Sequence, residues 1–504
     1  MTVIQREQMI CDNLKRNPSG ELCFADMELT PLAKKYGTPL YLYDEARVRH
    51  NCRVYLDAVR EGFGADAKVM YASKAASFKR IYEIIKEEGL GIDVVSCGEI
   101  YTAHLAGFPL ENAYFHSNNK TDSDIEFAID KGVGCFVVDN AEELFAIEEV
   151  AERRGIKQKI MLRITPGIDP HTYAAVATGK VDSKFGSAIE TGQAEAITSL
   201  ALTFPHLELC GFHCHVGSQI FDAEVYLSTS KIMLSFVADM ERKLGFICRD
   251  LDIGGGLGVR YIESQPVLDI KQAILTVAAE MKKLAKELGI SLPRISLEPG
   301  RSIVADAGLT LYTVGTVKRI PGYKSYVSVD GGMTDNPRFA LYGSPYTILP
   351  VNGEVGEDFE SCSVVGRCCE SGDILQENVP MRADVQRGDL LACLTTGAYH
   401  YSMASTHARL SRLCAHALLG LTQDFACAHP EPSYARVLGF RRDASPLLTH
   451  LQQAPLPVVV RASALRDDPL FLLERRATDL QSLCFPDETA RRAGRDLTEK
   501  MLVI

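Results

Sequence analysis

The sequence predicts an α/β protein with a (β/α)8 TIM-like barrel, a C-terminal all-β domain and a divergent tail. Eight strand-like runs alternate with helical or glycine-containing segments between residues 68 and 297, which is the rhythm of a closed parallel barrel. After residue 301 the chain changes to short β-rich runs separated by turns, which indicates a second domain. Motifs with chemically active side chains follow several predicted strands, at the edge where such barrels hold their active sites.

The segment before the barrel is mixed, and we expect residues 1–43 to contribute to the β domain. Residues 22–24 and 39–43 have the composition of short strands, and the second of these is aromatic. Residues 45–61 form the first predicted helix, because apolar residues recur along one of its sides.

The predicted barrel spans residues 44–300, and the predicted β domain spans residues 301–405. Eight strand–helix units over roughly 230 residues favour a closed barrel over an open sheet. The barrel strands are expected at residues 69–71, 92–95, 113–116, 135–138, 160–164, 209–213, 250–253 and 294–297. The strands of the β domain are expected at residues 309–317, 326–329, 361–365 and 390–394.

Lys74 stands where the first predicted barrel strand ends. A helix is expected at residues 78–88, with apolar residues Ile81, Ile84 and Ile85 on one face. A lysine at such a strand end can form a Schiff base with a carbonyl cofactor, provided that its amine is partly neutral. A lone lysine is more often a solvated surface residue, so the assignment depends on the segments that follow.

Two further motifs follow the sixth and seventh predicted strands. In the run from His213 to Gln219, an imidazole could stack on an aromatic cofactor and Ser218 could reach a phosphate. A zinc or core histidine pair is the alternative for His213 and His215, although no third ligand follows at metal spacing. The glycines of residues 252–258 let backbone N–H groups approach an anion, and we expect a following helix N-terminus to add its dipole. A plain tight turn explains these glycines equally well.

The eighth predicted strand is followed by Glu298-Pro-Gly300-Arg301. The carboxylate could pair with a protonated ring nitrogen, and the guanidinium could hold a substrate carboxylate in a fork. As a bare tetrapeptide the motif could also be a salt-bridged turn. Its position is informative, since barrels commonly bind phosphate after their last two strands.

Three segments of the β domain carry similar side chains. They are residues 330–342, 368–373 and 396–399. In the second segment a thiol, Cys369, stands beside a carboxylate, Glu370, and this pair is suited to delivering a proton and anchoring an ammonium group. Each segment alone is more often structural than catalytic, so their joint occurrence carries the argument.

The composition favours an enzyme of a reducing compartment, and we expect the cytoplasm. The net charge of −11 argues against a general nucleic-acid binder. The 15 cysteines are scattered, odd in number and without a CxxC pair, which does not suit a disulfide framework. We expect no signal peptide and no membrane span, because a basic region before an apolar core and an apolar run of about 18 residues are both missing.

Taken together, these motifs resemble those of the pyridoxal-phosphate-dependent decarboxylases of the alanine-racemase-like fold, and among them the diaminopimelate decarboxylases. The resemblance covers approximately residues 25–405 and is specific because the motifs occur jointly and in order. It implies a pyridoxal 5'-phosphate cofactor and a homodimer with shared active sites. It also implies lyase activity, in which meso-2,6-diaminopimelate loses CO₂ at its D-configured centre and gives L-lysine in the last step of lysine biosynthesis.

The resemblance assigns roles to single residues. Lys74 resembles the Schiff-base lysine, His215 the residue stacked on the cofactor ring, and Cys369 the proton donor, which with Glu370 would reach across the dimer interface. The cofactor-binding residues that it implies are Lys74, Asp93, His215, Ser218, Gly255, Gly256, Glu298, Gly300, Arg301 and Tyr399. The substrate-binding residues that it implies are Arg301, Arg338, Tyr342, Glu370 and Tyr399, and no metal site is implied.

An ornithine or arginine decarboxylase is the alternative within this fold. Those enzymes usually place an aspartate after the equivalent cysteine, where this chain has Glu370. Arg338 with Tyr342 also offers a site for the second carboxylate, which diaminopimelate has and ornithine lacks. A catalytically impaired relative that still binds the cofactor is a different hypothesis, and the intact Lys74 and Cys369 argue against it.

Residues 406–504 depart from the family pattern. That pattern calls for an Asn-Tyr-Asn-type segment and then Arg-Pro, whereas this chain continues Thr406-His-Ala-Arg-Leu-Ser-Arg-Leu. Twelve of the thirteen basic residues in this tail are arginines. An out-of-frame or substituted coding end would produce such a composition, and a genuine added domain is the alternative. In the first case we expect a tail that packs poorly, a β domain without its last strands and a weaker dimer.

Overall fold

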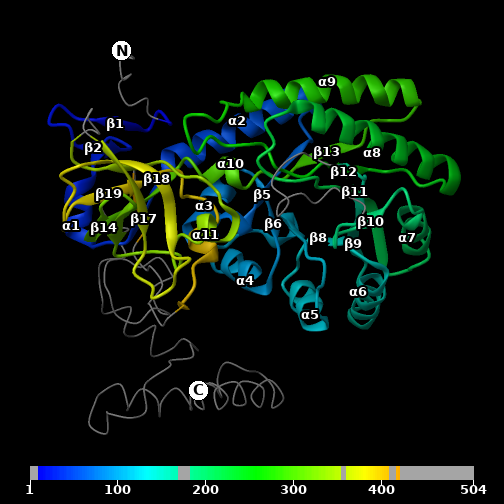
Figure 1. Ribbon diagram of the computed structural model, residues 1–504. Coiled ribbons are helices and arrows are strands. Elements are labelled where there is room, and N and C mark those ends of the chain that lie inside the picture. Colours follow the sequence, from blue (N-terminus) through cyan, green and yellow to red (C-terminus); the bar gives the residue numbers. More distant parts are fainter. Residues whose placement is uncertain (1–9, 169–181, 354–358, 408–415, 420–504) are drawn as a thin grey trace, which may run out of the picture.

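The computed structural model describes residues 10–168, 182–353, 359–407 and 416–419, and Figure 1 shows their arrangement. One half of the molecule is a barrel of parallel strands surrounded by helices. The other half is a sheet-rich domain that lies beside the barrel. Most of the tail predicted at residues 406–504 lies outside the described residues.

Eight parallel strands close the barrel, as the alternation of strands and helices predicted. Neighbouring strands pair around the ring, which is completed by β13 with β5 and by β9 with β8. Strands buried on both faces are nearly continuous apolar runs, as in Cys-Phe-Val-Val of the fourth strand. The strands are β5 (Lys68–Ala72), β6 (Gly91–Val94), β7 (Ala113–Phe115), β8 (Cys135–Val138), β9 (Gln158–Thr165), β11 (Leu207–His213), β12 (Asp250–Asp252) and β13 (Arg294–Leu297), and the short β10 (Ser187–Ala188) flanks β9.

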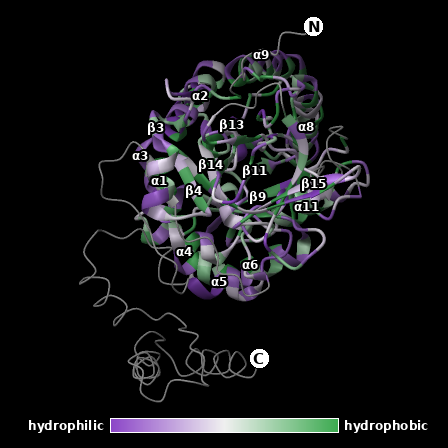
Figure 2. Ribbon diagram, turned by 60° about the vertical axis from the view of Figure 1, so that its left-hand side comes forward, coloured by the Kyte–Doolittle hydropathy of each residue, from purple (hydrophilic) through white to green (hydrophobic). Residues whose placement is uncertain are grey.

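A helix follows each barrel strand and covers the outside of the ring (Figure 1). In the first of these helices Ile81, Ile84 and Ile85 are all buried, which confirms the periodic pattern. Figure 2 shows hydrophobic residues along the barrel strands and mixed hydropathy on the surrounding helices. The helices are α3 (Lys79–Glu87), α4 (Cys97–Leu105), α5 (Asp122–Asp130), α6 (Ala141–Arg154), α7 (Gln193–Ala201), α8 (Ala223–Leu244), α9 (Ile270–Leu288) and α10 (Arg301–Val304), while α2 (Glu45–Phe63) precedes the ring and packs on α9.

The second domain is built on one mixed sheet of eight strands. The long strand β14 (Gly308–Ile320) pairs antiparallel with three others, and only two of the pairings are parallel: β15 with β17 and β20 with β4. The other strands are β4 (Leu40–Asp44), β15 (Lys324–Val329), β16 (Ile348–Pro350), β17 (Phe359–Val365), β18 (Ile374–Arg382), β19 (Leu390–Cys393) and β20 (His416–Leu419), and the short helix α11 (Arg338–Tyr342) lies between β15 and β16.

Two strands of this sheet, β16 and β18, were missed by the sequence pattern. In β18 the run Gln-Glu-Asn-Val-Pro interrupts the alternation of apolar residues, and Asn378 has a φ of +55°. Strand β16 has only three residues, so it carries too little pattern to be recognised. Strand β20 belongs to the divergent tail, and it extends the sheet by pairing with β4.

The N-terminal residues pack on the β domain. Strands β1 (Leu14–Arg16), β2 (Leu22–Phe24) and β3 (Met27–Glu28) form a small antiparallel sheet followed by helix α1 (Leu29–Tyr36). Leu22 and Phe24 are fully buried in one apolar cluster with residues of β4, β14 and β19. The first segment of the chain thus supports a sheet whose other strands, apart from β4, come from residues 308–419.

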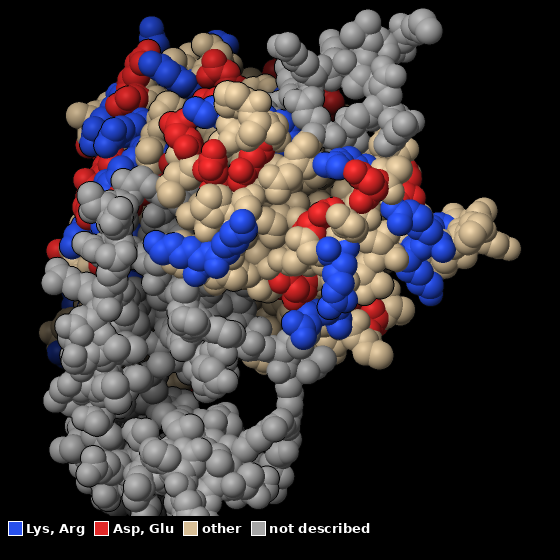
Figure 3. Space-filling view, turned by 90° about the vertical axis from the view of Figure 1, so that its left-hand side faces the viewer, with Lys and Arg blue, Asp and Glu red and all other residues tan. Residues whose placement is uncertain are grey.

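Two features of the surface bear on partners. Among the described residues, no helix combines the length and the hydropathy of a membrane span. On the face of the β domain shown in Figure 3, acidic and basic side chains are interspersed, without a continuous basic strip among the described residues. That nucleic acid is not a partner stays a prediction.

A buried ion pair fixes the loop that follows β7. The amine of Lys120 donates to Glu143 Oε1 at 2.7 Å in α6 and to the Val137 carbonyl at 2.8 Å in β8. Both side chains are almost completely buried. Removing one partner of such a pair leaves an unpaired buried charge, which is much more destabilising than removing both.

We therefore expect Lys120→Met to lower the free energy of unfolding by about 3 kcal/mol or more. The double variant Lys120→Met/Glu143→Leu should recover a large part of this loss, because no buried charge is left. Thermal unfolding followed by circular dichroism measures both. If the single variant were as stable as the wild type, this ion pair would not be needed to hold the loop.

Candidate active site

The predicted site residues converge at the carboxyl ends of the barrel strands. They line a cavity of about 400 Å³, counting the space that opens to solvent. Its walls contain nine of the predicted residues: Lys74, Asp93, His215, Ser218, Gly256, Glu298, Gly300, Arg301 and Tyr399. The segments that carry them come from β5, β6, β11, β12, β13 and the loop after β19, so the cavity depends on closure of the ring.

Lys74 lies in a short 3-10 turn, η1 (Ser73–Ala75), directly after β5. Its amine is 3.9 Å from Asp93 Oδ2, and Asp93 is buried. Burial opposes the charge, but Asp93, Tyr399 and Glu298 together raise the pKa of the Lys74 amine above its usual value. In the chain without a coenzyme, these neighbours favour the charged form of the Lys74 amine, and Asp93 is the nearest of them.

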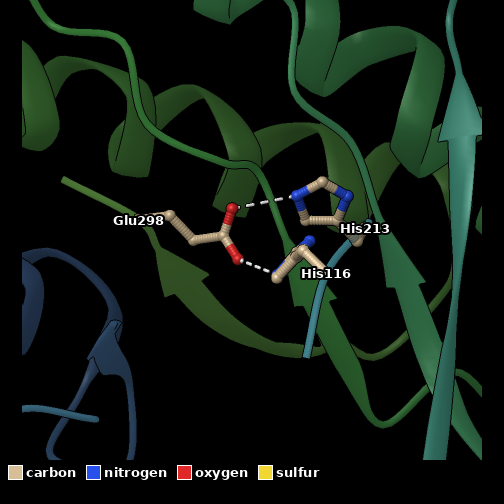
Figure 4. A group of neighbouring side chains, drawn as sticks. All are labelled: His116, His213 and Glu298. Atoms are coloured by element: carbon tan, nitrogen blue, oxygen red, sulfur yellow. Dashed lines mark hydrogen bonds and ion pairs between the residues drawn. The ribbon is translucent and has the colours of Figure 1, made fainter. Parts of the chain in front are cut away.

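Glu298 lies between two histidines, as Figure 4 shows. Oε1 is 2.6 Å from His116 Nε2, and Oε2 is 3.0 Å from His213 Nε2. Burial alone would raise the pKa of the Glu298 carboxyl, but His116 and His213 hold it well below its usual range. Burial lowers the pKa of His213 to about 4, so this imidazole is neutral near pH 7.

The sequence analysis did not identify His116. It is the polar residue at the end of the third predicted strand, and that position was the available signal. Of the two histidines of the motif at residues 213–219, His213 contacts Glu298, whereas His215 lines the cavity. The ligand-type atoms of His116, His213 and Glu298 all lie within 4.8 Å of one another, so the absence of a metal site stays a prediction.

The glycines beside the cavity are required by close backbone contacts. A Cβ on Gly256 would lie 2.1 Å from the Gly217 carbonyl oxygen, and its φ of +112° disfavours other residues. A Cβ on Gly255 would lie 2.0 Å from the Glu298 carbonyl oxygen. The expected helix N-terminus does not follow this loop directly, since α9 begins only at Ile270, so that part of the prediction is wrong.

A second cavity, of about 380 Å³, adjoins the first at Arg301. The guanidinium of Arg301 donates to Tyr261 Oη at 2.8 Å and to Ser218 Oγ at 3.1 Å, while Arg338 Nη2 reaches Ser344 Oγ at 3.4 Å. Its lining consists of Gln219, Tyr261, Gln265, Arg301, Arg338, Tyr342, Ser344 and Pro345.

Both arginines of this region are buried, and within the described part of the chain neither has a carboxylate partner. The ring of Tyr399 lies 4.7 Å from the guanidinium carbon of Arg301 and 5.2 Å from that of Arg338. Two buried cations that share one aromatic ring form a site for anionic groups, because unpaired buried charge is costly.

Three predicted residues line neither of these two cavities of their own chain. Cys369 and Glu370 are exposed in the segment between β17 and β18. Asp373 anchors this segment by accepting hydrogen bonds from the backbone N–H groups of Met333 and Cys368. The third is Gly255 of the glycine loop, whose N–H donates to His215 Nδ1 at 3.3 Å.

Two family models match this chain. One is described as pyridoxal-dependent decarboxylase, pyridoxal binding domain, and matches residues 46–305. The other is described as HIGH nucleotidyl transferase and matches residues 398–496, most of which lie outside the described residues.

Curated relatives extend the first match over most of the chain. The diaminopimelate decarboxylase of Bacillus methanolicus is 42% identical over 399 residues, which cover 79% of this chain and 92% of the relative. That of Mycobacterium tuberculosis is 36% identical over 411 residues, covering 79% of this chain and 90% of the relative.

Solved structures agree with this match. The structure of diaminopimelate decarboxylase from M. jannaschii in complex with L-lysine has a TM-score of 0.74 at 31% identity, covering 81% of this chain and 92% of that one. The Helicobacter pylori enzyme with L-lysine has a TM-score of 0.68 at 31% identity, covering 76% and 92%. The chain therefore belongs to the pyridoxal-dependent decarboxylases and, within them, to the diaminopimelate decarboxylase family.

Proposed function

We propose that this protein removes CO₂ from the D-configured centre of meso-2,6-diaminopimelate and releases L-lysine, the last step of lysine biosynthesis. The observation that carries the proposal is the pair of buried guanidinium groups, Arg301 and Arg338, which both lie close to the ring of Tyr399. Neither is neutralised by a carboxylate of the described residues, so this site suits the distal carboxylate of the substrate, which diaminopimelate has and ornithine lacks.

The first cavity fits pyridoxal 5'-phosphate on three observations. Glu298 Oε1 is buried and lacks a hydrogen bond of good geometry, which leaves an acceptor for a ring N–H. Gly256 and Gly300 line the cavity together with Ser218 and Arg301, which offers backbone and side-chain donors for a phosphate. Lys74 offers an amine at the opposite side of the same cavity. When bound, this coenzyme supplies a protonated ring that takes up the electron pair left by CO₂.

The residues of the cavity have the following proposed roles. Lys74 holds the coenzyme carbonyl, and Asp93 orients the Lys74 amine from 3.9 Å. His215 packs against the ring, and Glu298 accepts the hydrogen bond of the ring nitrogen. The proposed phosphate site consists of Ser218, Gly256, Gly300 and Arg301, which line the cavity, together with Gly255 of the same glycine loop, and Tyr399 closes the cavity toward the substrate.

Substrate recognition is proposed for the second cavity. Arg338 binds the distal carboxylate, Tyr342 lies against it with its ring 5.2 Å from the guanidinium carbon, and Arg301 connects the two cavities. The α-carboxylate that leaves must be placed against the coenzyme ring, away from these cations. Fixing the distal end in this way orients the D-centre toward Lys74.

We propose that the protein is a homodimer in which Cys369 and Glu370 serve the active site of the second copy. Both residues are exposed and outside these two cavities of their own chain, so they could serve a site only from a second copy of the chain. A thiol positioned by a partner would supply that proton. The twelve cysteines within the described residues are all free, which favours a reducing compartment such as the cytoplasm.

We also propose the division of the chain into residues 1–43 and 301–405 for the β domain, 44–300 for the barrel and 406–504 for the tail. The match of residues 398–496 to a nucleotidyl-transferase family supports an added segment over an out-of-frame end, because a frame-shifted sequence has no reason to match a protein family. An ornithine- or arginine-type activity, or an impaired relative, is the alternative that the following experiments exclude or establish.

Arg338→Gln should reduce kcat/KM for meso-diaminopimelate by about two orders of magnitude, since a charged hydrogen-bonded contact to the distal carboxylate is lost. The coenzyme content of the variant should stay at the wild-type level. Arg382→Gln is the matched control, because Arg382 pairs with Asp384 at the surface and should leave both quantities unchanged. Wild-type rates on ornithine that equal those on diaminopimelate would contradict the proposed substrate.

Mixing two inactive variants tests the shared site. Lys74→Ala and Cys369→Ala should each have little activity, and their mixture should recover about one quarter of the wild-type activity after subunit exchange, because half of the dimers are mixed and each has one intact site. Sizing chromatography of the mixture supplies the fraction of dimer. A mixture as inactive as its components, in a sample that does exchange subunits, would place Cys369 in its own chain's site.

A further inference from the structure

We propose that His116 and His213 are positioning residues that hold both carboxylate oxygens of Glu298 for the ring nitrogen of the coenzyme. This inference rests on the proposed function, since it takes Glu298 as the acceptor of that nitrogen. It assigns to the two histidines a role that the motifs of the chain do not reveal.

The geometry of the three side chains supports this role. They come from the ends of three separate barrel strands, β7, β11 and β13, and meet inside the ring (Figure 4). Each carboxylate oxygen faces a different imidazole, at 2.6 Å from His116 and 3.0 Å from His213. The two rings pack edge to face with centroids 4.7 Å apart, so neither can turn without moving the other.

The three side chains are buried, so few polar groups other than one another are available to them as partners. His116, His213 and Glu298 are 5%, 1% and 7% exposed. A buried carboxylate without donors becomes protonated, and a protonated carboxyl group cannot serve as the anionic acceptor that keeps a pyridine nitrogen charged. His213, by its hydrogen bond to Oε2, and His116, by its close contact with Oε1, hold the pKa of the Glu298 carboxyl low and so favour its anionic form.

The pKa values of two neighbouring carboxyl groups are shifted in the opposite direction to that of Glu298. Burial raises the pKa of Asp93, and burial together with Glu298 raises that of Asp252 well above its usual value. Glu298 is thus the carboxyl group of this cluster that the surroundings favour as an anion. The contacts continue from His116 Nε2 to Asp93 Oδ1 at 3.9 Å and from Asp93 Oδ2 to Lys74 at 3.9 Å, so one chain of polar groups connects both ends of the coenzyme site.

The test uses the holoenzyme reconstituted with coenzyme labelled with ¹⁵N in the ring. The chemical shift of that nitrogen reports whether it is protonated, and a titration of the apoenzyme reports the affinity for the coenzyme. Both readouts are independent of turnover. The variants are His116→Leu/His213→Leu, each single leucine variant, and His116→Gln/His213→Gln, in which the amide can place a donor near the position of Nε2.

The leucine variants should shift the ring nitrogen toward its unprotonated value and weaken coenzyme binding by about 10- to 100-fold, the usual effect of removing a hydrogen bond to a charged group. The glutamine variant should recover most of both losses. His206→Gln is the matched control, because His206 also pairs with a glutamate, Glu148 at 2.8 Å, but lies at the opposite end of the strands. Thermal unfolding of each apoenzyme shows whether a variant is still folded, so that a loss of fold is not mistaken for a loss of positioning. If a double variant does not fold, the single variants provide the test in its place.

Wild-type chemical shift and affinity in the leucine variants would overturn the inference. Glu298→Gln distinguishes this failure from a failure of the proposed function: if its ring nitrogen stays protonated, Glu298 is not the acceptor at all. A further contradicting result is one zinc ion per chain in metal analysis of the holoenzyme, lost in His116→Leu, because the three side chains would then be metal ligands rather than positioning groups.

Discussion

The pairing of β13 with β5 is the contact on which the rest of the structure depends. Ser296 and Leu297 of the last barrel strand pair with Lys68 and Val69 of the first, and this closes the ring. The same pairing places Glu298 across one cavity from Lys74, although the two residues are far apart in the sequence. Because all strands run in parallel, their carboxyl ends form one rim, and loops of unrelated sequence can contribute to a single site.

The site consists of two adjoining cavities, one proposed for the coenzyme and one proposed for the substrate. The part proposed for the coenzyme is built mainly from barrel strand ends, where the hydrogen bonds between the barrel strands fix the backbone. The part proposed for the substrate lies at the junction with the β domain, since Arg338 and Tyr342 come from that domain while Tyr261 comes from the barrel. Substrate recognition therefore depends on how well the β sheet is held together, including the edge at which β20 of the tail pairs with β4.

The sequence predicted the barrel well because its signal is repeated. Two of the eight strands, residues 135–138 and 294–297, were predicted with the bounds that the structure has, and Lys74 was recognised from its place after the first strand. The misses have physical causes. Strand β18 is interrupted by polar residues, and the raised pKa of Lys74 depends on Asp93, whose proximity is set by the ring and not by the sequence.

His116 shows the same limit more clearly. In the sequence it is one polar residue at the end of an apolar run, and its importance arises only when β7, β11 and β13 bring it against Glu298 and His213. The roles of single site residues therefore stay predictions that the geometry supports to different degrees. They are best supported where several buried polar groups converge, as around Glu298, and least where a residue is exposed, as Cys369 is.

The most direct test of this account is to locate the coenzyme on the chain. Purified protein should be yellow, and reduction with borohydride followed by peptide mapping should find the coenzyme attached to Lys74. Lys74→Ala should carry no reducible attachment even if it retains some bound coenzyme. Attachment to any other lysine would contradict the account, because the groups that surround Lys74 would then have no coenzyme to act on.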